Sequence, residues 1–203
     1  AGRTGWQLPL PAAQGGVSRI LEHFAASRLE QVFAGCFSRG WRTVLEGGVN
    51  EPYYQPAIGE GDMHRLFYRS DYFASALHEV AHWCIAGERR RQLADFGYWY
   101  APDGRSPQQQ SAFEAVEAKP QALEWLFSLA CGYRFRISVD NLGAAQAGEH
   151  DTAPFKQRVF SQARTWQKSR LPQRAELFFS ALSREFGTGL KPGDPELDLA
   201  ELA

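Results

Sequence analysis

Residues 76–87 read ALHEVAHWCIAG, and this stretch contains the motif H-E-x-x-H from His78 to His82. On an α-helix, residues four positions apart lie on one face about one turn from each other, so both imidazoles can reach a single metal ion. Glu79 points to the side of this pair, close enough to act on a metal-bound water or a substrate without being a ligand. The motif therefore predicts a metal-binding helix with Glu79 as its catalytic acid or base.

The residues around the motif are apolar on almost every side of the predicted helix, both in Tyr72–Leu77 and in Trp83–Ala86. A helix that is apolar all round is buried. Unpaired polar groups in a protein interior cost on the order of a few kcal/mol each, so the two histidines and the glutamate need partners. The partner is a metal ion or, in the simpler interpretation, a set of hydrogen bonds among core side chains.

A catalytic metal site of this type needs a third protein ligand and an open coordination position. The second long helical stretch, Ser106–Cys131, begins with an N-cap serine followed by proline and stops at Gly132. One polar stripe runs along it: Glu114, Glu117, Gln121 and Glu124. This stripe is either the solvated face of an amphipathic helix or a row of side chains that faces the histidines.

Within this stripe we choose Glu117 as the third metal ligand, with Glu114 as the alternative. Gln121 lies one turn beyond Glu117 and is expected to hydrogen-bond a ligand, a supporting role that also suits Glu114. Pro120 is expected to kink the helix near Val116 or to divide it in two.

The rest of the sequence predicts further helices and a few short strands around these two stretches. Helices are expected at 17–37, 155–168 and 173–186, and strands at 42–45, 53–55, 66–68, 96–100 and 134–139. Asp71 is a candidate cap for the motif helix. We therefore expect one helix-rich α+β domain at 17–186 with a small sheet, in which a zincin-like H-E-x-x-H helix faces the glutamate-bearing helix. Residues 1–16 are expected to form a flexible arm and 187–203 a tail.

The formal net charge is −1 and no long basic block occurs, so neither a nucleic-acid nor a membrane partner is expected. The short run Arg89-Arg90-Arg91 directly follows the motif helix. It is either a solvated helix end, where cations suit the helix dipole, or a docking contact for an acidic or nucleic-acid partner.

The three cysteines, Cys36, Cys84 and Cys131, lie far apart and are odd in number, which favours reduced thiols and a cytoplasmic protein. No apolar run reaches membrane-spanning length, and no signal peptide is visible.

Two segments resemble the bacterial elongation factor P hydroxylase family. They are YFASALHEVAHWCIAGERRRQLADFGYWYAPDGR at 72–105 and FEAVEAKPQALEWLF at 113–127. The most characteristic features are LHEVAHWCIAG, DFGYWY, PDGR and VEAKPQAL, followed by Asp140-Asn141-Leu142. This combination is far more specific than H-E-x-x-H alone.

The resemblance implies a metal-dependent enzyme whose partner is elongation factor P, in which it hydroxylates a lysine already extended by a β-lysyl group. Carried onto this chain, the metal ligands would be His78, His82 and Glu117, with Glu79 as acid or base. Two histidines and one carboxylate leave positions open on Fe(II) for molecular oxygen and substrate. Because the same ligand types suit Zn²⁺, only the resemblance favours iron and oxidation.

Two other functions are compatible with the same residues. In a zinc metallopeptidase, Glu79 would activate a zinc-bound water for attack on a peptide carbonyl. In a non-catalytic module, the metal would be purely structural. Metal content together with dependence on oxygen separates the hydroxylase from the peptidase.

A β-lysyl-lysine side chain is long and aliphatic and carries amines, so its pocket should combine aromatic walls with a carboxylate. The segment at 95–105 has this mixture, and we expect Asp103, Tyr98 and Tyr100 to bind substrate. The alternative is an aromatic strand packed in the core, with Asp103 merely in a turn.

Overall fold

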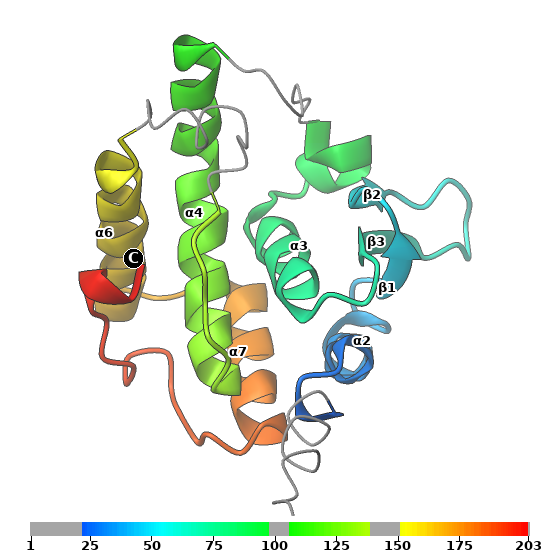
Figure 1. Ribbon diagram of the computed structural model, residues 1–203. Coiled ribbons are helices and arrows are strands. Elements are labelled where there is room, and N and C mark those ends of the chain that lie inside the picture. Colours follow the sequence, from blue (N-terminus) through cyan, green and yellow to red (C-terminus); the bar gives the residue numbers. More distant parts are fainter. Residues whose placement is uncertain (1–21, 98–105, 139–150, 203) are drawn as a thin grey trace, which may run out of the picture.

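The computed structural model describes residues 22–97, 106–138 and 151–202, in which helices pack beside a small sheet (Figure 1). The α-helices in this part of the chain are Ala26–Phe37 (α2), Phe73–Ile85 (α3), Pro107–Cys131 (α4), Ala153–Lys168 (α6) and Gln173–Glu185 (α7). The strands are Thr43–Val49 (β1), Tyr53–Gln55 (β2) and His64–Arg69 (β3), and the short 3₁₀ helices are Arg90–Gln92 (η1), Ala94–Gly97 (η2) and Leu199–Leu202 (η3). The predicted helix-rich α+β fold is confirmed.

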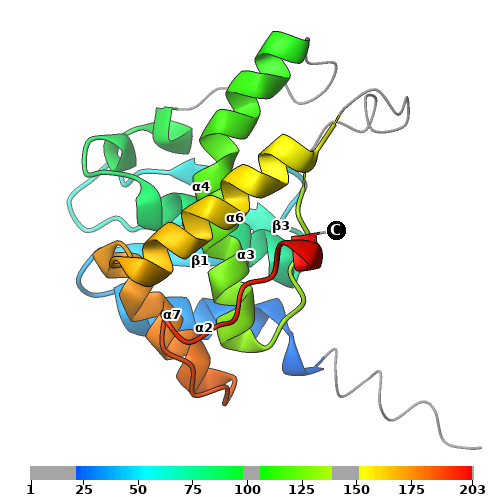
Figure 2. The same ribbon diagram turned by 90° about the vertical axis from the view of Figure 1, so that its left-hand side faces the viewer.

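The elements are arranged in layers around α3 and α4. The sheet lies on one side, α3 packs against β3 and against α4, and α6 covers the far side of α4 (Figures 1 and 2). Helix α7 lies beside the lower half of α4 in Figure 1 and contacts α4, α3 and α2. The motif helix therefore lies between the sheet and the long helix, as the sequence predicts.

The sheet has the strand order β1-β3-β2, with β1 parallel and β2 antiparallel to β3. The ladder between β1 and β3 is irregular between Glu46 and Val49. A Cβ atom on Gly47 would lie 2.6 Å from the ring of Tyr68, so this position requires glycine. Glu30 of α2 accepts hydrogen bonds from the Gly47 N–H and the Tyr68 hydroxyl, and thereby joins α2 to the sheet.

Helix α3 is buried along most of its length, as its apolar sequence predicts; its buried residues are Phe73, Ala76, Leu77, Val80, Ala81, Trp83 and Cys84. The Trp83 ring packs against Phe33 and Phe37 of α2, with ring centroids 5.2 and 4.7 Å away. The predicted cap at Asp71 is wrong. The N-cap residue is Tyr72, and no side chain caps it, because α3 is held by tertiary burial instead.

Arg174 of α7 holds the C-terminal end of α3. One of its terminal nitrogens donates to the carbonyl oxygens of Trp83, Cys84 and Ala86 at 2.9, 3.1 and 2.5 Å. Its guanidinium also lies 4.7 Å from the centre of the Trp83 ring. Arg91 adds a hydrogen bond to the Ala86 carbonyl at 2.8 Å. The carbonyls that every helix leaves without internal donors at its C-terminus are therefore satisfied by two cations.

We expect Arg174→Ala to lower the free energy of unfolding by about 3 kcal/mol. The variant loses hydrogen bonds from a charged donor and leaves the carbonyl groups at the end of α3 buried without that donor. For a chain of this size that corresponds to roughly 6–12 °C in melting temperature. Arg170→Ala is the matched control, since its side chain is 84% exposed and paired with Glu176, and exposed pairs contribute under about 1 kcal/mol. Equal shifts in the two melting curves would refute the role assigned to Arg174.

Helix α4 begins with the predicted cap, since Ser106 accepts from the Gln109 N–H and the Gln109 side chain accepts from the Ser106 N–H. It ends at Gly132, which is left-handed with φ 67°. Pro120 does not divide the helix, which is continuous from Pro107 to Cys131. Packing against α3, α6 and α7 holds α4 together across the proline.

The predicted strand at 134–139 is wrong over its described residues, and the described part of the strand or extended segment expected at 96–100 is a 3₁₀ turn. Residues 133–138 form no strand, because the backbone of Ser138 bonds the side chain of Gln121 rather than a neighbouring strand. Phe96 lies in η2 with Asp95, both in left-handed conformation. The Asp95 carboxylate accepts the Tyr54 N–H, and the Phe96 ring stacks on the Tyr54 ring at 4.4 Å, which fixes this turn against β2.

After α7 the chain returns along the outside of the molecule to η3, which packs on α6 and buries Leu202. The three cysteines are free, and Cys84 and Cys131 are buried. Among the described helices, none combines the length and apolar character that a membrane span requires.

Candidate metal centre

His78, His82 and Glu117 converge on one point between α3 and α4. The Nε2 atoms of the two histidines are 3.0 Å apart. The Glu117 oxygens lie 3.3 Å from His82 Nε2 and 3.4 Å from His78 Nε2. The helical spacing of the motif brings the imidazoles together, and the packing of α4 on α3 supplies the carboxylate.

This donor set fits a divalent metal ion. Atoms bound about 2.0–2.2 Å from one ion lie roughly 3–3.5 Å from each other, and the observed separations of 3.0, 3.3 and 3.4 Å fall in that interval. One ligand atom from each of the three residues can be chosen so that all lie within 4.8 Å of one another. Two imidazoles and one carboxylate suit Zn²⁺ and also Fe(II).

Glu124, two turns after Glu117 along α4, fixes the orientation of His78. Its carboxylate lies 2.8 Å from His78 Nδ1, which leaves Nε2 directed at His82 and Glu117. Burial lowers the pKa of His78, but the hydrogen bond to Glu124 and the nearby carboxylate charges raise it to about 10. The sequence places Glu124 seven residues after Glu117, two helical turns on, and that spacing is the signal that could have assigned it a role.

We expect Glu124→Gln to weaken metal affinity by about 10–100-fold, the usual cost of losing a partner that orients a ligand histidine. Competition against a coloured chelator measures this directly. Glu114→Gln is the matched control, because Glu114 is a buried glutamate of the same stripe that bonds Gln110 and Arg158. Unchanged affinity in Glu124→Gln would show that His78 is oriented by something else.

The polar stripe on α4 is buried rather than solvated, because Glu114, Glu117, Gln121 and Glu124 are all less than 8% exposed. Among the described residues, the group that could hold a metal contains Glu117 and not Glu114. The Glu114 carboxylate lies 2.6 Å from Arg158 of α6 and accepts from Gln110. Of the two candidates for the third ligand, the structure thus brings Glu117 to the site and uses Glu114 to join α4 to α6.

Gln121 contacts Glu117 and the chain beyond α4. Its amide donates to the Ser138 carbonyl at 2.6 Å and accepts from the Ser138 N–H at 3.0 Å. Burial raises the pKa of Glu117, but the two histidines and a hydrogen bond from Gln121 outweigh burial and bring the pKa to about 2. Glu117 is therefore an ionised carboxylate, the form that binds a metal.

Glu79 lies beside the three converging groups and is not one of them. In the described part of the chain, no hydrogen bond engages its carboxylate. Burial raises the pKa of Glu79 above its ordinary value, although the charges of His78 and His82 oppose this shift. A glutamate with a raised pKa next to a metal site is suited to act as a general acid or base.

A pocket of about 720 Å³ reaches the metal centre at His82 and is lined by residues at the end of α3 and in the first half of α4. His82, Val116 and Pro120 contribute to its walls, and Arg89, Arg90 and Lys119 to its rim. Because residue 120 is proline, the Val116 carbonyl has no helical N–H donor and remains an acceptor in this wall. The predicted substrate residues Asp103, Tyr98 and Tyr100 lie outside the described residues.

The fold and the site define an α+β protein with a buried pair of histidines and a carboxylate on facing helices. Comparison with known families gives a match to Elongation factor P hydroxylase over residues 32–193. The Elongation factor P lysine hydroxylase of Haemophilus influenzae is 45% identical over 157 residues, which cover 77% of this chain and 86% of that protein. The chain belongs to the elongation factor P hydroxylase family, a family of protein-modifying enzymes.

Proposed function

We propose that this protein is a metal-dependent hydroxylase that adds one oxygen atom to a lysine side chain of elongation factor P. The observation that carries the proposal is the convergence of His78, His82 and Glu117 in a member of this family. The name of the Haemophilus influenzae relative supports the substrate. The finer proposal is that the substrate lysine already carries a β-lysyl group and that the metal is iron.

His78, His82 and Glu117 would hold the ion. Fe(II) bound by two histidines and a carboxylate keeps coordination positions open and supplies the means to activate molecular oxygen next to a substrate. Glu124 holds the His78 ring in place, and the hydrogen bond from Gln121 does the same for the Glu117 carboxylate. These two hydrogen bonds keep the three ligand side chains, which come from two helices, oriented toward one point.

The remaining residues handle the substrate and its protons. The apolar part of the pocket wall accommodates the aliphatic portion of a lysine side chain. The Val116 carbonyl and the Glu79 carboxylate can accept hydrogen bonds from an ammonium group, which must not be buried without a partner. Glu79 is the group that gives or takes a proton during turnover.

A zinc peptidase is the competing function, because an H-E-x-x-H helix with Glu79 beside the ligands also suits attack of water on a peptide bond. Co-expression with elongation factor P in bacteria that lack their own hydroxylase distinguishes the two. The proposal predicts that the target peptide of the factor gains one oxygen atom and that the factor stays intact. A shortened factor without added oxygen would favour the peptidase.

The metal is tested by purifying the protein without oxygen and determining its bound metal. We expect the purified protein to contain iron and the iron-loaded protein to hydroxylate the factor. Protein loaded with zinc is expected to be inactive. Because the proposed substrate is a translation factor, we infer a cytoplasmic enzyme that needs neither nucleic acid nor a membrane as partner.

A further inference from the structure

The rim of the pocket at the metal centre is basic. Arg89 and Arg90 follow the end of α3, Lys119 lies on α4, and all three are exposed and line the pocket to which His82 contributes. Glu88 is the acidic residue among those that line it. Since the net charge of the whole chain is only −1, this excess of cations at the mouth is a local feature.

The side chains of the three consecutive arginines after α3 differ in their hydrogen-bond partners. Arg91 points inward and donates to the Ala86 carbonyl, and Arg90 donates to the Phe96 carbonyl. In the part of the chain that the structure describes, no acceptor engages the side chains of Arg89 and Lys119. Capping α3 therefore explains Arg91 but leaves Arg89 and Lys119, from two different elements, without a structural role.

The metal centre, which this pocket meets at His82, is rich in carboxyl groups. Three carboxylates, those of Glu79, Glu117 and Glu124, surround the two histidines. Glu117 is ionised, because the two histidines and Gln121 bring its pKa to about 2, whereas burial raises the pKa of Glu79 and of Glu124. The carboxyl groups of the metal centre therefore form an acidic floor that attracts an amine, whereas the basic rim repels an amine and attracts acids.

We propose that the basic rim formed by Arg89, Arg90 and Lys119 docks acidic side chains that flank the target lysine on the surface of the protein substrate. The lysine enters toward the acidic floor while its acidic neighbours meet the rim, so the charge pattern selects a lysine in an acidic setting. This inference rests on the proposed function, because it takes the substrate to be a protein. A rim of charges of this kind acts mainly on association rate and partner choice.

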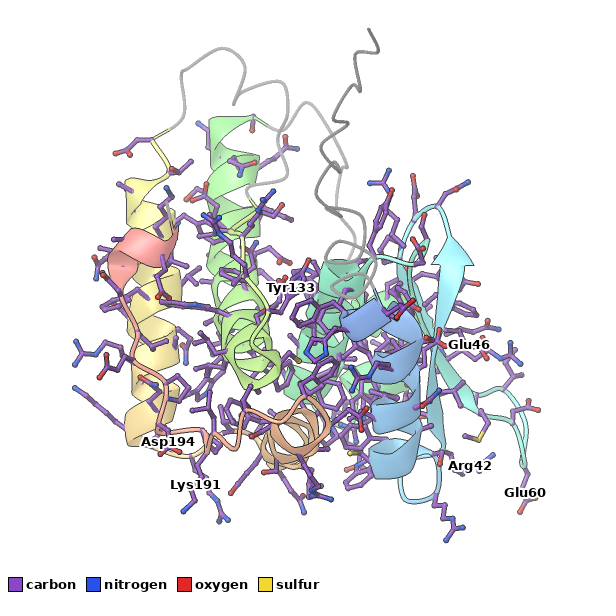
Figure 3. The ribbon with its side chains drawn as sticks, turned by 60° about the horizontal axis from the view of Figure 1, so that its bottom comes forward. Arg42, Glu46, Glu60, Tyr133, Lys191 and Asp194 are labelled. Carbon is purple, nitrogen blue, oxygen red and sulfur yellow. The ribbon has the colours of Figure 1, made fainter. Side chains whose placement is uncertain are left out.

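The test compares two double charge reversals that change the net charge equally. Arg89→Glu with Lys119→Glu alters the rim. Arg39→Glu with Lys191→Glu alters exposed cations elsewhere, and Lys191 lies beside Asp194 on the loop after α7 (Figure 3). Binding of lysylated elongation factor P is followed by fluorescence anisotropy at several salt concentrations, and hydroxylation is measured separately in co-expressing cells.

The rim variant is expected to bind the factor about 10-fold more weakly at low salt and to lose most of the salt dependence, while the control stays within about 2-fold of the parent. Replacing acidic residues next to the target lysine with lysine should weaken binding to the parent protein and restore binding to the rim variant. That reciprocal rescue is specific to docking, because a folding defect would not be repaired by the partner.

Equal affinities of the two double variants for the factor would overturn the proposal. It also fails if the rim reversal abolishes binding of a fluorescent RNA and leaves the affinity for the factor unchanged, since the rim would then serve nucleic acid. Rim-dependent binding of a factor that never gains oxygen would instead refute the proposed function and leave the docking surface standing.

Discussion

Replacing His78 or His82 with alanine is expected to remove the bound metal and, with it, all hydroxylation. Each variant deletes one of three protein donors whose ligand atoms lie within 4.8 Å of one another, and two remaining donors hold a divalent ion poorly. Glu117→Ala should have the same effect. Elemental analysis of each purified variant gives metal content, and the mass of elongation factor P from co-expressing cells gives activity.

Glu114→Ala is the control for the ligand variants. It removes a buried glutamate from the same face of α4, but one that pairs with Arg158 instead of the histidines. It should lower the melting temperature, because Arg158 loses its buried partner, and yet keep a full complement of metal. Full metal occupancy in His78→Ala or His82→Ala would contradict the ligand assignment, and metal loss in Glu114→Ala with occupancy kept in Glu117→Ala would transfer the role to Glu114.

Glu79→Gln is expected to keep the metal and reduce the initial rate of hydroxylation by about 10²–10⁴-fold, the usual contribution of a general acid or base. Glutamine preserves the size of the side chain but cannot take up a proton, so the loss isolates proton transfer from packing. Rates are compared in extracts of the producing cells, with Glu51→Gln, an exposed residue between β1 and β2, as control. Metal loss in Glu79→Gln would mean that Glu79 is a ligand, and an unchanged rate would remove it from the chemistry.

The sequence predicts the two central helices well because their signals are local. The spacing of His78 and His82 and the apolar flanks describe α3, and the capping serine and the stop at Gly132 describe α4. The choice of Glu117 over Glu114 depended on how α4 is rotated against α3. Helical periodicity puts both on one stripe, and only tertiary packing decides which reaches the histidines.

Other features depend on contacts between segments far apart in the chain, and sequence patterns do not reveal those. Arg174 caps α3 from a helix about ninety residues later, whereas the local candidate Asp71 caps nothing. Ser138 lies in a segment with strand-like sequence, but its backbone N–H and carbonyl form hydrogen bonds with the side chain of Gln121. The glutamate stripe is likewise buried because α3 and α6 cover α4. The sequence of the stripe alone does not predict that these helices pack on it.

Incorporation of isotopically labelled molecular oxygen tests the central claim most directly. Cells that produce this protein together with elongation factor P are exposed to heavy-isotope dioxygen, and the target peptide of the factor is analysed by mass spectrometry. We expect the lysine side chain to gain one heavy oxygen atom with the parent protein and none with His82→Ala. Heavy oxygen on the lysine with His82→Ala, or none with the parent protein, would show that the protein is not a hydroxylase that depends on this metal centre.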